Sequence, residues 1–275
     1  MNFLALFTSV VFASTATLPF FHNPSIVSAP LQPSQSFDAI VKTLQPPPQP
    51  TPSTAPKQYT IALLGDSMID TLGAAAPDLN SALTTFFPNT RWTIFNYGVG
   101  ATTVDNGIER ITNSYTYKGQ VVPALETKHL SLLVVESFAY NPYANGTDGL
   151  SRYQEQLGNL VETLRTYFPG VPLVFVVTIA PNSRLFGDGA PGIAFSPEEK
   201  RERTDTIQSY LATAVRFARS ERLPLADLYD ASLMPNGDGD PIYISGTDHI
   251  HYSAVGRMLF TQKVIETIAV NRLVN

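Results

Sequence analysis

Two short segments, far apart in the sequence, carry the residue types that together make a nucleophile. Ser67 follows the apolar residues 59–64 within the sequence Gly-Asp-Ser-Met, and Asp248 and His251 lie three positions apart near the C-terminus. A serine hydroxyl is a weak nucleophile until an imidazole takes its proton and a carboxylate orients the imidazole. We therefore interpret Ser67 as a candidate nucleophile, His251 as its base and Asp248 as the orienting acid.

Each segment also has a simpler interpretation. Gly-Asp-Ser after a strand is often only a turn and a helix cap, and we assign such a supporting role to Asp66. His249 and His251, with a nearby carboxylate, resemble part of a zinc site. A third imidazole ligand is hard to supply, however, because His22 lies in the N-terminal tail and His129 precedes a predicted strand at the far edge of the sheet. We favour the triad and expect no metal. His249 is the less favoured base, because a glycine stands three positions before it.

Composition limits the class of molecule. The chain has 275 residues, 44% of them hydrophobic and 15% charged, which is enough for one catalytic-sized domain with a buried core. The formal net charge of -5 argues against a nucleic-acid partner or an anionic membrane surface. The sequence has no cysteine, so disulfides and thiolate metal sites are excluded.

The N-terminal part differs from the rest in composition. Residues 3–16 are apolar and uncharged and end in small residues, as in a secretory signal peptide. Because no Lys or Arg precedes them, an uncleaved signal anchor is the alternative. Residues 22–58 are rich in Pro, Ser, Gln and Thr, which favours a disordered linker. We therefore predict a signal or anchor at 1–21, a linker at 22–58 and one domain at 59–275, in a secreted or membrane-tethered protein.

From residue 59 onward, apolar strand-like segments alternate with longer amphipathic segments. This alternation predicts an α/β fold of three layers, with helices on both faces of a five-stranded parallel sheet. The predicted strands are 59–64, 93–96, 130–136, 173–178 and 225–228, and the predicted helices are 78–87, 104–112, 150–168, 197–219 and 253–271. The helix at 197–219 has the clearest start, because Ser196 and Glu199 form a capping box around Pro197.

The candidate residues follow different strands of this predicted sheet. Ser67 comes after the first strand, Gly100 after the second, Asn141 after the third, and Asp248 and His251 after the last. Loops at the carboxyl ends of parallel strands meet at one edge, where ligands bind. Acyl transfer from an ester passes through an oxyanion, and the amides of Ser67, Gly100 and Asn141 would supply three donors to it. We expect these five residues to form one site.

Four segments resemble, in order, the sequence blocks of SGNH hydrolases, the GDSL-type esterases and lipases. The matching segments are 65–68, 96–103, 139–142 and 248–251. In the second block, Gly100 is the better match for the glycine whose amide helps form the oxyanion hole, and Gly98 is the alternative. In the third block Asn141 is kept, while the flanking glycine and aspartate are replaced by alanine and proline. The resemblance covers the chain from residue 59 onward and implies a flavodoxin-like order of the strands.

The resemblance also implies a function. It predicts a serine esterase with the triad Ser67, Asp248 and His251, an oxyanion hole of Ser67, Gly100 and Asn141, and no cofactor. Export on a Pro-rich linker points to O-acetyl groups of carbohydrate as the substrate, and we expect a monomer. The alternatives are a lysophospholipase or thioesterase, a sugar O-acyltransferase of the same fold, and a non-catalytic carbohydrate-binding module with a degenerate site.

Further residues lie close to these motifs in the sequence. Glu136 ends the third predicted strand, where burial would shift its pKa; the alternative is a paired structural acid. Phe138, Tyr140 and Tyr143 surround Asn141, and we expect packing rather than stacking on sugar rings. The loop at residues 181–195 has three glycines and suits either a mobile substrate rim or a solvated connection.

Overall fold

Five parallel strands form the main sheet of the computed structural model, which describes residues 55–274. The predicted N-terminal signal and nearly all of the predicted linker lie outside these residues. The strand order is β2-β1-β5-β6-β7, the flavodoxin-like order, so the predicted fold class is confirmed. The strands are β1 (Lys57–Gly65), β2 (Thr90–Gly98), β5 (Leu132–Glu136), β6 (Leu173–Val177) and β7 (Leu225–Asp227).

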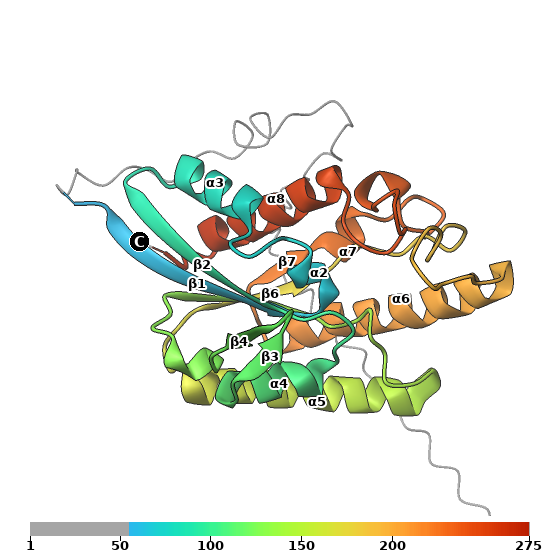
Figure 1. Ribbon diagram of the computed structural model, residues 1–275, viewed down its shortest axis with the longest axis horizontal. Coiled ribbons are helices and arrows are strands. Elements are labelled where there is room, and N and C mark those ends of the chain that lie inside the picture. The colour runs from blue at the N-terminus through green and yellow to red at the C-terminus, as the bar shows by residue number, and fades with distance from the viewer. Residues whose placement is uncertain (1–54, 275) are drawn as a thin grey trace, which may run out of the picture. The chain divides into compact units, whose positions relative to one another are not determined.

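Helices cover both faces of the sheet (Figure 1). One face carries α2 (Ser67–Asp70), α3 (Pro77–Phe86), α7 (Leu228–Ala231) and α8 (Ala254–Val270), and the other carries α4 (Val104–Thr112), α5 (Gly146–Tyr167) and α6 (Pro197–Ser220). Short 3-10 turns lie at η1 (Leu125–Thr127) and η2 (Pro241–Tyr243). Successive residues of a strand point to opposite faces. Ile61 and Leu63 of β1 therefore join one buried cluster, while Ala62 and Leu64 join the other.

The predicted helices agree with the observed ones to within a few residues. The helix predicted at 104–112 has these bounds, and the predicted capping box at the start of α6 is present. Ser196 Oγ accepts a hydrogen bond from the Glu199 amide at 3.2 Å, and the Glu199 carboxylate accepts one from the Ser196 amide at 2.7 Å. Between residues 55 and 274, no helix has both the length and the hydrophobicity needed to cross a membrane.

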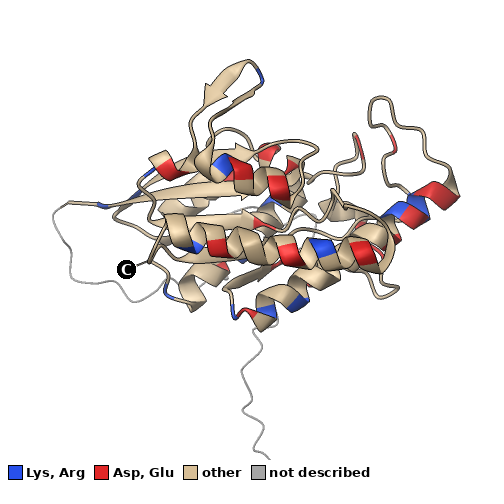
Figure 2. Ribbon diagram, turned by 90° about the horizontal axis from the view of Figure 1, so that it is seen from below, with Lys and Arg blue, Asp and Glu red and all other residues tan. Residues whose placement is uncertain are grey.

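An antiparallel hairpin that was not predicted from the sequence lies between α4 and η1. Its strands are β3 (Tyr115–Tyr117) and β4 (Gln120–Val122), which pair only with each other in a separate two-stranded sheet. Lys118 and Gly119 form the turn with φ values of 49° and 74°, as a two-residue hairpin turn requires. In Figure 2 this hairpin projects from the neighbouring helices and strands.

Candidate active site

The turn from β1 into α2 exposes Ser67 between buried neighbours. Asp66 and Met68 are fully buried, whereas Ser67 is partly exposed. Asp66 caps α2, since its Oδ1 accepts the Met68 amide at 2.8 Å, which confirms its predicted supporting role. Gly65 permits this tight turn, because a Cβ there would lie 2.3 Å from the Ile69 side chain. The local sequence thus presents the serine at the carboxyl end of β1.

The structure separates the roles of the two candidate glycines, Gly98 at the end of β2 and Gly100 just after it. A Cβ on Gly98 would lie 2.2 Å from the Asp70 amide nitrogen, and the Gly98 amide donates to Asn96 Oδ1 at 2.8 Å. Gly98 therefore allows β2 to pack against α2. A Cβ on Gly100 would instead lie 3.9 Å from Ser67 Cβ, so Gly100 is the glycine beside the candidate nucleophile.

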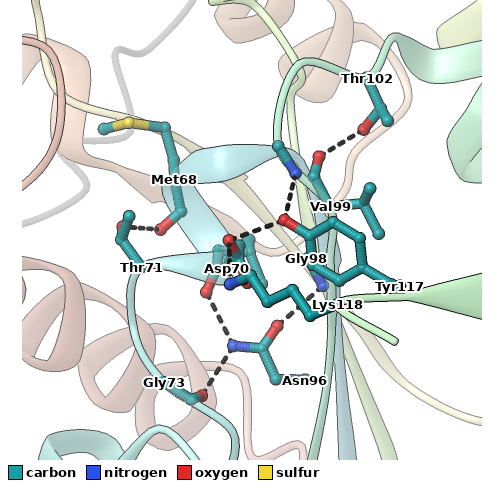
Figure 3. Close-up of polar contacts among 12 residues, drawn as sticks. Met68, Asp70, Thr71, Gly73, Asn96, Gly98, Val99, Thr102, Tyr117 and Lys118 are labelled. Atoms are coloured by element: carbon teal, nitrogen blue, oxygen red, sulfur yellow. Dashed lines mark hydrogen bonds and ion pairs between the residues drawn. The ribbon is translucent and has the colours of Figure 1, made fainter. Parts of the chain in front are cut away.

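The Gly100 amide already has an acceptor. It donates to the phenol oxygen of Tyr117 at 3.1 Å. The Tyr117 hydroxyl in turn donates to Asp70 Oδ2 at 3.0 Å (Figure 3). Lys118 Nζ contacts both oxygens of Asp70 at 2.9 Å. Sequence reasoning missed these hairpin residues. The available signal was Gly119 between the strand-like residues 115–117 and 120–122, because glycine readily adopts the positive φ of a two-residue hairpin turn.

Asn141 lies beside the nucleophile turn, although the rest of its predicted block has changed. Its side-chain Nδ2 donates to Asp66 Oδ2 at 2.7 Å. A primary amide has two N–H donors, so one remains for a further acceptor. The backbone amide of Asn141 donates to the Phe138 carbonyl at 3.2 Å, in a turn where Phe138 has a φ of 57°. This turn brings the third block to the carboxyl end of β1.

Asp248 and His251 form the predicted pair. His251 Nδ1 lies 2.8 Å from Asp248 Oδ2, while Asp248 Oδ1 accepts the amides of Ile250 and His251 at 2.9 Å and 3.1 Å. Partial burial alone would raise the pKa of Asp248, but these hydrogen bonds hold it below its usual value. The Asp248 carboxylate thus stays ionised and holds the imidazole of His251 at Nδ1. Among the described residues, no hydrogen bond joins the Ser67 hydroxyl to His251.

His249 has different surroundings from His251. Its Nδ1 lies 2.8 Å from the Asp188 carbonyl oxygen, in the loop after β6, and its φ is 51°. Within residues 55–274, no three His, Cys, Asp or Glu side chains are grouped as a metal ion would require. The described residues therefore give the alternative zinc site no set of ligands.

Two buried carboxyl groups lie under the candidate nucleophile. Burial raises the pKa of Asp66 to about 6, against the hydrogen bonds from Met68 and Asn141 that lower it. Burial also raises the pKa of Glu136 well above its usual value, and the neighbouring charge of Asp66 adds to this. Glu136 accepts hydrogen bonds from the Ser137 hydroxyl at 2.8 Å and the Phe138 amide at 2.9 Å. Glu136 is thus buried, as the sequence suggested, and its hydrogen bonds also fit the alternative of a paired structural acid.

The aromatic residues around Asn141 mainly pack within the fold. Phe138 is 1% exposed and lies under the Arg110 guanidinium, 5.8 Å from the ring centre. The Tyr140 hydroxyl donates to the Ile179 carbonyl at 3.1 Å. Tyr143 is partly exposed and hydrogen-bonds to Asp105. The expectation of packing is confirmed for Phe138 and Tyr140, whose contacts are internal.

Solved structures share this fold. A lipase/acylhydrolase from Enterococcus faecalis is 16% identical with a TM-score of 0.54, over 78% of this chain and 96% of the other. A putative acylhydrolase from Bacteroides fragilis is 17% identical with a TM-score of 0.55, over 80% and 93% of the two chains. A variant of an acetyl-xylooligosaccharide esterase from Geobacillus is 13% identical with a TM-score of 0.52, over 78% and 96%.

The sequence itself matches neither a protein-family model nor a curated protein. The structural matches nevertheless span nearly the whole length of the solved chains and more than three quarters of this one. They include a GDSL-like lipase from Bacteroides thetaiotaomicron, with 12% identity and a TM-score of 0.53 over 78% and 89% of the two chains. The domain formed by residues 55–274 therefore has the three-layer fold of the SGNH hydrolases, as the four sequence blocks predicted.

Proposed function

We propose that the protein is a serine esterase that hydrolyses carboxylic esters with Ser67, His251 and Asp248. The observation that carries the proposal is the 2.8 Å contact between His251 Nδ1 and Asp248 Oδ2. This contact directs Nε2, the other ring nitrogen, to the task of a general base. The partly exposed Ser67 at the end of β1 and the nearby Gly100 further support this assignment.

The proposed reaction has two steps. Ser67 Oγ attacks the ester carbonyl carbon while His251 Nε2 takes its proton, and Asp248 stabilises the resulting imidazolium. The carbonyl oxygen becomes an oxyanion that receives hydrogen bonds from the amides of Ser67 and Gly100 and from Asn141 Nδ2. Each such donor is typically worth about 10²–10³ in rate. His251 then protonates the leaving alcohol, and water hydrolyses the acyl-enzyme by the reverse proton transfers.

For the substrate, we propose an O-acetyl ester of a carbohydrate. The proposal is supported by the fold shared with an acetyl-xylooligosaccharide esterase and an acetyl xylan esterase, and by the signal-like residues 3–16, which suggest action outside the cytoplasm. A lipid ester is the second candidate, because structures of a lipase/acylhydrolase and a GDSL-like lipase share the fold as well. We also propose that the protein acts as a monomer without a cofactor.

The test is hydrolysis of p-nitrophenyl esters of increasing acyl length by the full chain and by its Ser67→Ala variant. We expect the variant to lose about 10³-fold or more of kcat. Preference for acetate would favour the carbohydrate esterase, and preference for long acyl chains would favour the lipase. Full activity in Ser67→Ala, or complete inactivity of the parent on every ester, would overturn the catalytic assignment. Glycan binding without turnover would then favour the binding module.

A further inference from the structure

The β3–β4 hairpin places the Tyr117 hydroxyl against the Gly100 amide, which the proposed reaction needs free for the oxyanion. The Tyr117 phenol oxygen accepts the Gly100 amide at 3.1 Å, and it would lie 3.5 Å from a Cβ on Gly100. A backbone amide has a single hydrogen, so Gly100 has no second bond of this kind to give. An oxyanion that binds Gly100 at the usual 2.7–3.1 Å would have to replace the phenol.

The tip of the hairpin is attached to α2 through the carboxylate of Asp70. Asp70, the last residue of α2, accepts the Tyr117 hydroxyl at 3.0 Å and contacts Lys118 Nζ at 2.9 Å (Figure 3). The Lys118 side chain is 66% exposed and that of Asp70 is 21% exposed. Exposed ion pairs contribute little to stability, because water and salt screen them. These contacts can therefore be exchanged for water at modest cost.

The base of the hairpin is held more firmly. Tyr115 packs beside the buried Tyr97, with 6.5 Å between ring centres, and under the buried Arg110 guanidinium at 5.9 Å. After β4, the Pro123 carbonyl accepts the Tyr97 hydroxyl at 3.1 Å. Val121 of β4 is 74% exposed. The hairpin thus has a packed base and a tip attached by polar contacts, which is the arrangement of a hinged segment.

We propose that the β3–β4 hairpin is a cover of the oxyanion site, which Asp70 holds closed and which the substrate displaces. The inference rests on the proposed function, because the covered position matters only if Gly100 stabilises an oxyanion. In the closed form, Tyr117 occupies the Gly100 amide and excludes the ester carbonyl. In the open form, the phenol leaves, and the Gly100 amide turns from a structural donor into a catalytic one. The energy needed to open the cover is subtracted from the binding energy of the substrate.

The experiment compares Tyr117→Phe with the parent chain. The phenylalanine keeps the ring but removes the oxygen that competes for Gly100. We expect kcat/KM for p-nitrophenyl acetate to rise about fivefold to thirtyfold, since one to two hydrogen bonds no longer need to be broken. The labelling rate of Ser67 by a small fluorophosphonate should rise by a similar factor. Lys118→Gln, which leaves Gly100 and the phenol untouched, should raise both rates about twofold to fivefold. Tyr167→Phe, at an exposed tyrosine of α5, is the matched control and should change neither rate.

The outcomes separate this inference from the proposed function. If Ser67→Ala abolishes hydrolysis but Tyr117→Phe and Lys118→Gln leave the rates unchanged, the esterase stands and the cover is wrong. If Tyr117→Phe lowers kcat at constant KM, the phenol is itself a donor to the oxyanion, and the cover is again wrong. If the parent and every variant are inert to both reagents, the proposed function fails and the cover fails with it.

Discussion

The two halves of the candidate site differ in how ready they are to react. The acid–base half, Asp248 and His251, lies within four consecutive residues, and its hydrogen bonds already orient the imidazole as the proposed mechanism needs. The oxyanion half draws on the ends of three strands. Its Gly100 amide is engaged with Tyr117, and Asn141 gives one of its two side-chain N–H groups to Asp66. A locally built pair can be ready before the substrate arrives, whereas the Gly100 amide must exchange its partner when the substrate binds.

Removing the orienting carboxylate tests the ready half and should give the largest effect. In Asp248→Asn, the amide can hold the imidazole in the wrong tautomer, so we expect kcat to fall about 10³-fold or more. The measurement is steady-state hydrolysis of p-nitrophenyl acetate. His249→Gln is the matched control, because its ring contacts the Asp188 carbonyl instead, and it should retain activity within about threefold. Equal losses of kcat in both variants would argue that the conformation of the loop, rather than the contact between Asp248 and His251, is needed for activity.

Shortening Asn141 tests the engaged half. Asn141→Ala removes one proposed oxyanion donor, and we expect kcat to fall about 10²-fold with little change in KM. The variant also deprives Asp66 of a hydrogen bond, so thermal unfolding should be measured beside the kinetics. A loss of stability with unchanged kcat would make Asn141 a brace for the nucleophile turn and nothing more.

Substitutions of Gly98, which ends β2, and of Gly100, just after it, sharpen the comparison further. In Gly98→Ala, the methyl group would meet the α2 backbone at 2.2 Å, and we expect a loss of about 3 kcal/mol in the free energy of unfolding. In Gly100→Ala, the nearest atoms are at 3.5 Å and 3.9 Å, so stability should change by only about 0.5 kcal/mol. The kcat/KM of Gly100→Ala should still fall about tenfold, because the methyl crowds the space beside Ser67. Urea unfolding and ester hydrolysis, measured on both, would expose a reversal of these roles.

The pH dependence of stability tests the buried acid that joins the two halves, with the smallest expected effect. The pKa of Asp66 is about 6 in the folded protein against a usual 3.8, so between these values the folded state binds more protons than the unfolded state. The stability contributed by Asp66 must therefore fall as pH rises from 4 to 6. We expect the free energy of unfolding of Asp66→Asn, relative to the parent, to increase over this interval. A difference that is constant with pH would show that Asp66 titrates normally.

Long helices and strands could be predicted from the sequence, whereas short ones could not. The apolar runs of β1, β5 and β6 and the amphipathic period of α6 are long enough to be recognised. The three-residue strands β3 and β4 are partly or fully exposed and have no such pattern, so the cover was missed. The burial of Arg110 was not predicted either, because a charged residue on a helix usually faces solvent. In the structure Arg110 is 4% exposed, and its side chain donates to the Gly65 carbonyl at 3.1 Å.

The fold class, the order of the four blocks and the spacing of Asp248 and His251 can all be read from the sequence. These features depend on periodicity and on neighbours three residues apart, which are short-range properties of the chain. Three features appear only once the chain is folded: Gly100 rather than Gly98 lies beside Ser67, Tyr117 accepts the Gly100 amide, and burial raises the pKa of Asp66. Burial and hydrogen bonds between distant segments do not exist until the elements pack, so no local pattern could reveal them.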